Sequence, residues 1–197
     1  FRIPADRKAS KQFCLFCFRI DPTNYYQLLP LGRKGEGVFK YLKELSQSEE
    51  GKLVLNEINE NLSLLDWFDH IEVPATGLSN DYTVYIKDRY LTDTMSYFDQ
   101  RSTNEGFLYL LFYFTLFISK DTPAFFAIDN IESSFNPKLC TKIIEVLQKL
   151  AVKHNKQVIL TTHNPFILDG LDLSDEDQRL GQFFQIFKDT FAFSTQR

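Results

Sequence analysis

Cysteine is scarce in this sequence, and its scarcity excludes a fold held together by disulfides. Three cysteines occur among 197 residues, whereas small disulfide-bonded domains carry an even, closely spaced set. Cys14 and Cys17 have C-x-x-C spacing, but no second pair follows to complete a zinc site. Because residues 13–20 are typical of an apolar strand, the two thiols are expected on opposite faces, as buried side chains.

Long apolar runs and a strong net charge are also lacking. The longest apolar run, Phe107 to Ile118, is interrupted only by Thr115 and is shorter than the roughly 20 residues that span a membrane. The net charge is −4, so the chain has no general basic footprint for nucleic acid. With no signal-peptide pattern either, we expect no membrane partner and a cytoplasmic location.

A phosphate-binding loop is the third absence. The glycine-rich segment 31–37 does not follow the pattern G-x-x-x-x-G-K-[ST], because Val38 and Phe39 come directly after Gly37. This segment is therefore predicted to be the entry to a helix. Since the chain begins at Phe1 rather than Met, we expect the P-loop and the first strands of the domain to lie upstream.

Apolar periodicity predicts an alternation of helices and strands. Helices are expected from Val38, over 52–68, over 107–118 and over 138–153, and a short one near 165–171; strands are expected at 13–20, 71–73, 82–86, 124–128 and 157–161. The last two strands and the helix between them have short joins, which predicts a right-handed βαβ unit. The predicted fold class is therefore α/β with a parallel sheet.

Polar residues follow both strands of this unit, where ligands bind to parallel sheets. Asp129 comes directly after one strand, and Thr161, Thr162 and His163 come after the other. A carboxylate in this place can hold Mg²⁺ through its waters, and the metal can bridge nucleotide phosphates. His163 is predicted to sense a terminal phosphate or to position a water. The alternative is that Asp129 only caps a turn and His163 lies on the surface.

Three segments resemble the motifs of ABC-type ATPase heads, in the order of that family. Residues 128–137 (IDNIESSFNP) are similar to the Walker B and D-loop segment, and residues 160–169 (LTTHNPFILD) to the switch-histidine loop. Residues 101–108 (RSTNEGFL) resemble the signature motif. The likeness is to the branch with RecF-like, structural-maintenance-of-chromosomes (SMC) and overcoming-lysogenization-defect (OLD) proteins, and it covers about residues 13–188.

The resemblance implies that residues 1–197 form the C-terminal part of one P-loop NTPase head. About 13–100 would be a helical and β lead-in, and about 101–188 the core with the three motifs. It also implies ATP and Mg²⁺ as cofactors and a second head as partner, in a homodimer or a higher oligomer. DNA or an effector nuclease subunit would be a further partner.

The same resemblance assigns the site residues. Asp129 would be the metal-side carboxylate, and His163 the switch histidine. Nucleotide contacts, partly across the head–head interface, would come from Asn104, Glu105, Gly106, Asp129, Ser133, Ser134 and Asn136. Asn104 stands where the family usually has Ser, and its amide can still donate a hydrogen bond to a phosphate.

Asn130 departs from the family pattern, which has Glu at this position to polarise the attacking water. A carboxamide orients a water but has no useful basicity, so slow hydrolysis is expected. Glu132 is the nearest carboxylate and is predicted to be catalytic together with Asn130 and His163.

Three functions are compatible with these residues. The first is a dimerising ATPase head that acts as a nucleotide-driven clamp in DNA repair or anti-phage defence. The second is a nucleotide-sensing scaffold that binds ATP between subunits with little turnover. The third is an α/β binding module in which the motifs occur by chance.

Overall fold

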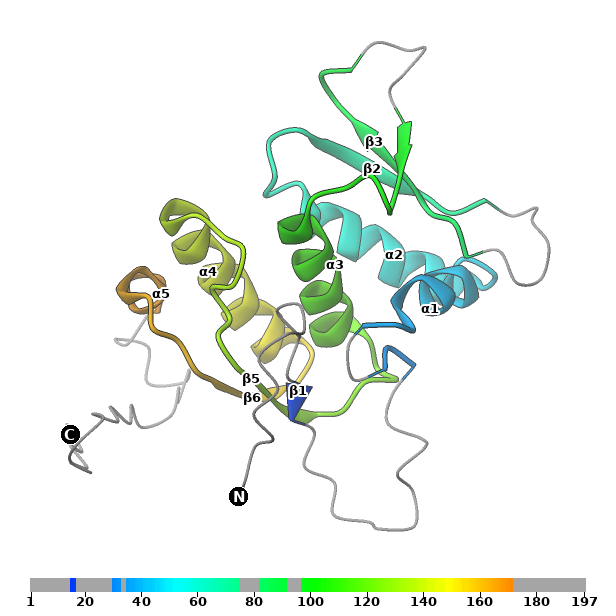
Figure 1. Cartoon of the computed structure of the whole chain (residues 1–197). Coiled ribbons are helices and arrows are strands. Elements are labelled where there is room, and N and C mark those ends of the chain that lie inside the picture. Colours follow the sequence, from blue (N-terminus) through cyan, green and yellow to red (C-terminus); the bar gives the residue numbers. More distant parts are fainter. Residues whose placement is uncertain (1–14, 17–29, 33–34, 75–81, 92–96, 172–197) are drawn as a thin grey trace, which may run out of the picture.

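The computed structural model describes residues 15–16, 30–32, 35–74, 82–91 and 97–171. Five helices lie in this part of the chain: α1 (Val38–Leu45), α2 (Glu49–Leu62), α3 (Glu105–Ile118), α4 (Pro137–Lys153) and α5 (Pro165–Asp169). One sheet has the order β1 (Leu15–Phe16), β5 (Phe125–Ile128), β6 (Gln157–Leu160), and the other β2 (Phe68–Glu72), β3 (Tyr85–Asp88), β4 (Tyr97–Asp99). The two sheets lie on opposite sides of the helices (Figure 1).

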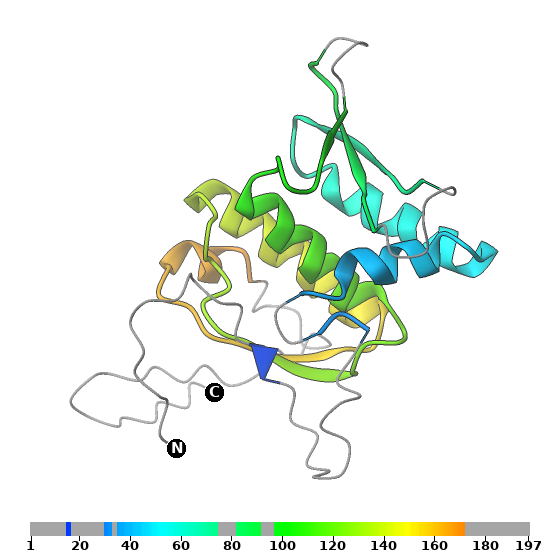
Figure 2. The same cartoon turned by 45° about the vertical axis from the view of Figure 1, so that its right-hand side comes forward.

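The predicted βαβ unit is confirmed as a parallel strand pair joined by one helix. Strands β5 and β6 are parallel, with Phe125 opposite Gln157 and Ile128 opposite Leu160. Helix α4 connects them and lies beside α3 above the strands (Figure 2). The sheet is not parallel throughout, because β1 pairs with β5 in the antiparallel direction. The predicted thiols Cys14 and Cys17 lie outside the described residues.

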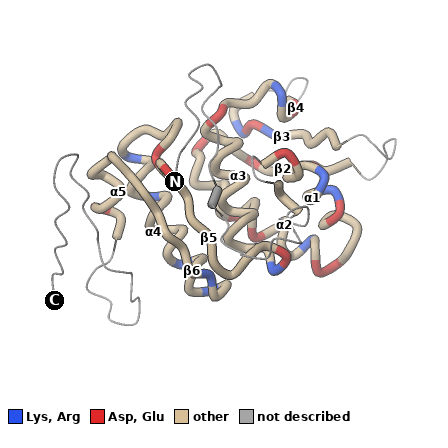
Figure 3. The backbone as a smooth tube through the Cα atoms, turned by 60° about the horizontal axis from the view of Figure 1, so that its bottom comes forward, with Lys and Arg blue, Asp and Glu red and all other residues tan. Residues whose placement is uncertain are grey.

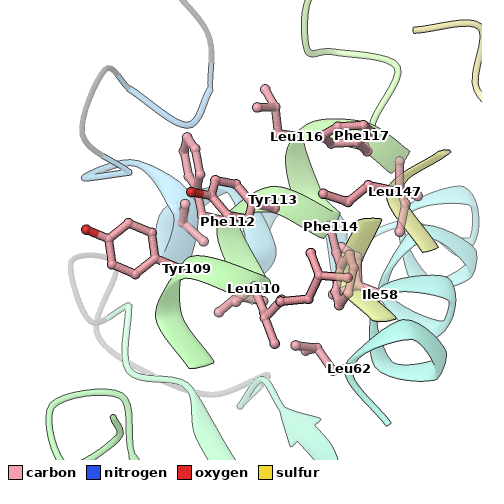
Figure 4. Packing of buried hydrophobic residues seen from close by; sticks show 14 of the residues in the cluster. Ile58, Leu62, Tyr109, Leu110, Phe112, Tyr113, Phe114, Leu116, Phe117 and Leu147 are labelled. Carbon is pink, nitrogen blue, oxygen red and sulfur yellow. The ribbon is translucent and has the colours of Figure 1, made fainter. Parts of the chain in front are cut away.

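Helix α3 is the centre of the hydrophobic core. Eleven of its fourteen residues are buried, from Phe107 to Ile118 with the exception of Leu108. Figure 4 shows its side chains leaving in several directions, with Ile58 and Leu62 of α2 on one side and Leu147 of α4 also in contact with the cluster. A helix that is apolar on every side must be surrounded by other elements. The prediction of a central, buried helix at 107–118 is therefore confirmed.

The predicted helix over 52–68 is wrong at its C-terminal end. Helix α2 stops at Leu62, the Ser63 hydroxyl donates to the carbonyl of Glu60, and Phe68 already begins β2. Phe68 is nevertheless fully buried. An apolar residue in the core looks the same in the sequence whether a helix or a turn and strand carry it there, so periodicity extended the helix too far.

Strands β2, β3 and β4 form a small antiparallel sheet over α2. The predicted strands near 71–73 and 82–86 correspond to β2 and β3, which pair with Ile71 opposite Ile86. Strand β4 was not expected from the sequence, because its three residues lie within the stretch 92–106, which is polar on both sides of them. Figure 3 shows acidic and basic residues interspersed over this lobe of α1, α2 and β2–β4.

Lys156 fixes the amino-terminal ends of the parallel strands β5 and β6. Its ammonium group donates hydrogen bonds to the carbonyls of Ser119 (2.8 Å), Thr122 (3.0 Å) and Pro123 (3.2 Å), and to the Thr122 hydroxyl (2.9 Å). Burial lowers the pKa of Lys156. The turn between α3 and β5 is thus tied to the residue that precedes β6.

Glu57 links α2 to the end of α4 and makes the stability of the fold sensitive to acid. Its Oε1 accepts hydrogen bonds from Lys153 (2.8 Å) and His154 (2.7 Å). Burial raises the pKa of Glu57, but the hydrogen bonds from Lys153 and His154 outweigh it and leave the pKa below its ordinary value. A carboxyl group with a lowered pKa in the folded state stabilises the fold above its unfolded-state pKa, and this contribution is lost as the pH falls through the folded-state pKa.

We therefore expect Glu57→Gln to cost about 0.5–1 kcal/mol of unfolding free energy near neutral pH, as a partly screened ion pair does. Between about pH 6 and pH 3 the variant should lose less stability than the wild type. Urea unfolding at several pH values measures both quantities. The exposed Glu60→Gln serves as control, and an equal acid sensitivity of wild type and Glu57→Gln would contradict the assignment.

Candidate functional site

The polar residues that follow β5 and β6 lie together, as the strand register requires. The Thr161 hydroxyl donates a hydrogen bond to Asp129 Oδ1 and accepts one from the Asn130 backbone N–H at 3.0 Å. The Ile131 N–H donates to the Thr161 carbonyl at 3.2 Å. The two strand ends are therefore joined in both directions. Thr161 was not among the predicted site residues, although a hydroxyl directly after a strand could have indicated it.

Asp129 is exposed at this edge, with one oxygen bound to Thr161. Among the described residues no three His, Cys, Asp or Glu side chains converge. A closed metal site built by side chains is therefore not present in that part of the chain. The donor set fits a hard cation such as Mg²⁺, which usually takes one or two carboxylates and completes its shell with waters and phosphates.

Glu132 holds the loop that carries His163. Its Oε1 accepts the backbone N–H of His163 at 2.8 Å, and its Oε2 is buried without a hydrogen-bond partner among the described residues. Burial raises the pKa of Glu132, but the His163 N–H and the Thr162 hydroxyl outweigh it and leave the pKa below its ordinary value. Glu132 is thus a negatively charged acceptor directed at the loop.

The His163 side chain itself is exposed. The loop behind it is held on both sides, because the Asn164 N–H donates to the Thr162 hydroxyl at 3.0 Å and Thr161 binds the β5 turn. Within the described part of the chain the imidazole forms no hydrogen bond of its own. A fixed backbone with an uncommitted ring is the arrangement that a ligand-contacting residue requires.

Asn130 has a left-handed backbone conformation, with φ of 52°. Its carbonyl accepts the Ser133 N–H at 2.9 Å, which closes the turn after β5. Asn tolerates this region better than most residues with a side chain. The amide at this position is therefore explained by the backbone, independently of catalysis.

Replacement of Asn130 by Ala is expected to cost about 1 kcal/mol of unfolding free energy, because a Cβ without a local polar partner is strained at positive φ. Asn130→Gly should differ from the wild type by less than about 0.5 kcal/mol. Urea unfolding measures both values. Asn155, with φ of 53°, lies just before β6, at the end of that strand opposite the candidate site. It is a matched control, and the same pair of variants there should behave alike. A cost for Gly equal to that for Ala would refute the backbone explanation.

The signature-like residues lie against the turn that follows β5. Glu105 Oε2 accepts a hydrogen bond from the Ser134 hydroxyl at 3.0 Å. A Cβ on Gly106 would lie 3.1 Å from the Ser134 carbonyl oxygen, so the close approach favours glycine. Ser134 has φ of 70°. Residues 104–106 and 133–134, predicted separately, thus form one surface.

Two of the predicted asparagines cap helices. Asn104 Oδ1 accepts the Phe107 N–H at 2.8 Å at the start of α3, and Asn136 Oδ1 accepts the Leu139 N–H at 2.9 Å at the start of α4. An Asn cap of this type typically contributes about 1 kcal/mol. The observed contacts of Asn136 are structural, and its predicted contact with a nucleotide stays a prediction.

Residues 97–169 match a family model described as "AAA domain, putative AbiEii toxin, Type IV TA system". The matched segment begins with β4 and ends with α5, so it contains both strand ends. The match supports an AAA- or ABC-like ATPase domain. No curated protein matches the sequence. The general family and the nucleotide-binding character predicted above are thus supported, whereas the narrower RecF, SMC or OLD grouping stays a prediction.

The mixed α/β fold with its parallel β5–β6 pair is compatible with a P-loop NTPase-like domain. Within the described residues, no helix is long and apolar enough to cross a membrane.

Proposed function

We propose that this chain is the C-terminal part of an ATPase head that binds ATP and Mg²⁺ and hydrolyses ATP slowly. Two heads would dimerise around the nucleotide and act as a nucleotide-driven clamp. The family description, which mentions a toxin of a type IV toxin–antitoxin system, favours anti-phage defence over DNA repair as the setting. The proposal includes the narrower kinship with RecF-like, SMC and OLD proteins.

The observation that carries the proposal is the joined pair of strand ends within the matched AAA segment. Asp129 and the loop with His163 lie at the carboxyl edge of a parallel pair, where α/β proteins bind ligands. Thr161 holds the two together. A carboxylate and an imidazole that follow two paired strands at the same edge are suited to a metal-bound phosphate.

In the proposed complex Asp129 would hold Mg²⁺, which neutralises phosphate charge when bound. Thr161 orients the Asp129 carboxylate by donating to one oxygen and leaves the other available. His163 would donate a hydrogen bond to the terminal phosphate. These groups act by position and electrostatics, which is where most of the catalysis in phosphoryl transfer arises.

The surface of residues 104–106 and 133–134 would face the second head. The hydrogen bond between Ser134 and Glu105 and the close approach of Gly106 give this surface a defined shape. The first residues of a helix such as α3 have backbone N–H groups without partners inside the helix, and such groups attract phosphate. A partner's nucleotide would bind there.

Asn130 supports the second candidate function, a scaffold that keeps ATP between its subunits with little turnover. The position after Asp129 carries no carboxylate to accept a proton from water. Its left-handed backbone also disfavours most replacements. The two candidates share the site and differ in the rate of hydrolysis and in whether the subunits stay associated without ATP.

The test uses the intact protein and measures Mg²⁺-dependent ATP binding, ATP turnover and oligomer mass with and without ATP. A clamp predicts ATP-dependent association with slow turnover, and Asn130→Glu should raise the rate. A scaffold predicts one mass in both conditions and negligible turnover. An intact protein that binds no ATP would contradict both candidates and leave the simple binding module.

A further inference from the structure

The contacts of Glu132 suggest a different role from that of the predicted water-activating carboxylate. A general base must reach the proton that it removes, with a free oxygen directed at the water. In Glu132 one oxygen accepts the His163 N–H at 2.8 Å, and the other is buried. One oxygen is thus occupied by the loop backbone, and the other is out of contact with solvent.

We propose that Glu132 is a positioning residue for His163, which fixes the backbone of the loop so that the imidazole reaches the terminal phosphate. The proposal rests on the proposed function and adds to it the means by which the histidine is placed. It makes no demand on Glu132 as a proton acceptor.

The turn that carries Glu132 is itself well anchored, which a positioning residue requires. Phe135 packs edge-on against Tyr109 and Tyr113 of α3, with ring centroids 6.2 and 6.3 Å apart. Ile131, next to Glu132, is fully buried. The carboxylate therefore projects from a rigid base in the core toward a loop at the surface.

Glu132 also complements the other contacts of the loop. Thr161, the first residue of the loop, is hydrogen-bonded to Asp129 and Asn130. Glu132 holds the loop backbone two residues later, at the His163 N–H. With both points fixed, the direction of the His163 Cα–Cβ bond is set. Without the second point, His163 would rotate about the Thr161 anchor, and small displacements of a phosphate-contacting group lower the rate strongly.

The two roles make opposite demands on the side chain. Positioning needs an acceptor that reaches the His163 N–H, so Glu132→Gln keeps the function and the shorter Glu132→Asp loses it. General-base catalysis needs the carboxylate, so Glu132→Gln would lower turnover by about 10²–10⁴-fold.

The experiment measures kcat and KM for ATP in the intact protein for Glu132→Gln, Glu132→Asp, His163→Ala and the double variant Glu132→Asp with His163→Ala. We expect the kcat of Glu132→Gln to be within about threefold of the wild-type value and that of Glu132→Asp to be about tenfold lower. The second loss is smaller than the roughly 100-fold loss that a misplacement of about 1 Å can produce. The double variant should be no slower than His163→Ala, because residues that act as a unit are not additive.

A readout beside turnover is the hydrogen exchange of the His163 amide, which should be near wild type in Glu132→Gln and faster in Glu132→Asp. The pH–rate profile of Glu132→Gln should keep its wild-type shape. Loss of the acidic limb together with a 100-fold lower kcat in Glu132→Gln would overturn the proposal and restore the role of a base.

Additive losses in the double variant would also overturn the proposal, since Glu132 would then act independently of His163. Both overturning results are measured against a wild type with ATP turnover, so they contradict only the role of Glu132. A wild type without ATP turnover would contradict the ATPase function itself.

Discussion

Replacement of Asp129 by Asn is expected to lower ATP turnover by about 100-fold or more, the range seen when one electrostatic contact to a transition state is removed. The amide keeps an oxygen for the Thr161 hydroxyl, so the joined strand ends should persist. It removes the negative charge that would hold Mg²⁺ beside the phosphates. The loss should therefore appear in kcat, while the fold remains intact.

Turnover of the intact protein over a range of Mg²⁺ concentrations measures this effect. Excess Mg²⁺ should restore part of the rate if the charge of Asp129 acts through the metal. Asp169→Asn, at the exposed end of α5, is the control and should leave turnover unchanged. An Asp129→Asn enzyme as fast as the wild type would place the metal site elsewhere.

Replacement of Phe126 by Ala is expected to lower the free energy of unfolding by about 3–5 kcal/mol. Its side chain is fully buried and meets Phe117 of α3 edge-on, with ring centroids 5.1 Å apart. The removed ring leaves a cavity between the sheet and the central helix, and the surrounding side chains cannot collapse to fill it completely. Urea-induced unfolding followed by circular dichroism measures the change.

The neighbouring Phe125 provides the matched control. It lies on the opposite face of the same strand and is 41% exposed, so Phe125→Ala should cost about 1 kcal/mol or less. Equal costs for the two variants would mean that both faces of β5 are buried alike. The comparison therefore also tests which side of the β5–β6 pair faces the core.

The sequence predicted the elements whose apolar pattern has one interpretation. Helix α4 has a single buried stripe and begins at Asn136-Pro137, a typical start of a helix. Helix α3 is apolar on all sides, which requires a central position. The predicted helix was extended past Leu62 in error, because Phe68 is buried as part of a strand. Strand β4 was missed because it has only three residues and they lie within a polar stretch.

The candidate site was predictable in its location but not in its contacts. Strand ends can be found from the sequence, and Asp129 and His163 were found in this way. Which oxygen accepts which N–H depends on the backbone of two turns, so the engagement of Glu132 with the His163 amide was not evident. The left-handed backbone of Asn130 likewise explains why an Asn occupies this position, and the spacing of residues in the sequence does not reveal that conformation.

The four hydrogen bonds of Lys156 restrict how the length of the chain can vary among related proteins. The ammonium group binds residues 119, 122 and 123 at once. An inserted or deleted residue in this turn would leave carbonyls or the half-buried ammonium group without partners, which is costly. Length variation among homologues should therefore occur elsewhere, and natural sequences with an altered 119–123 turn should also lack the lysine.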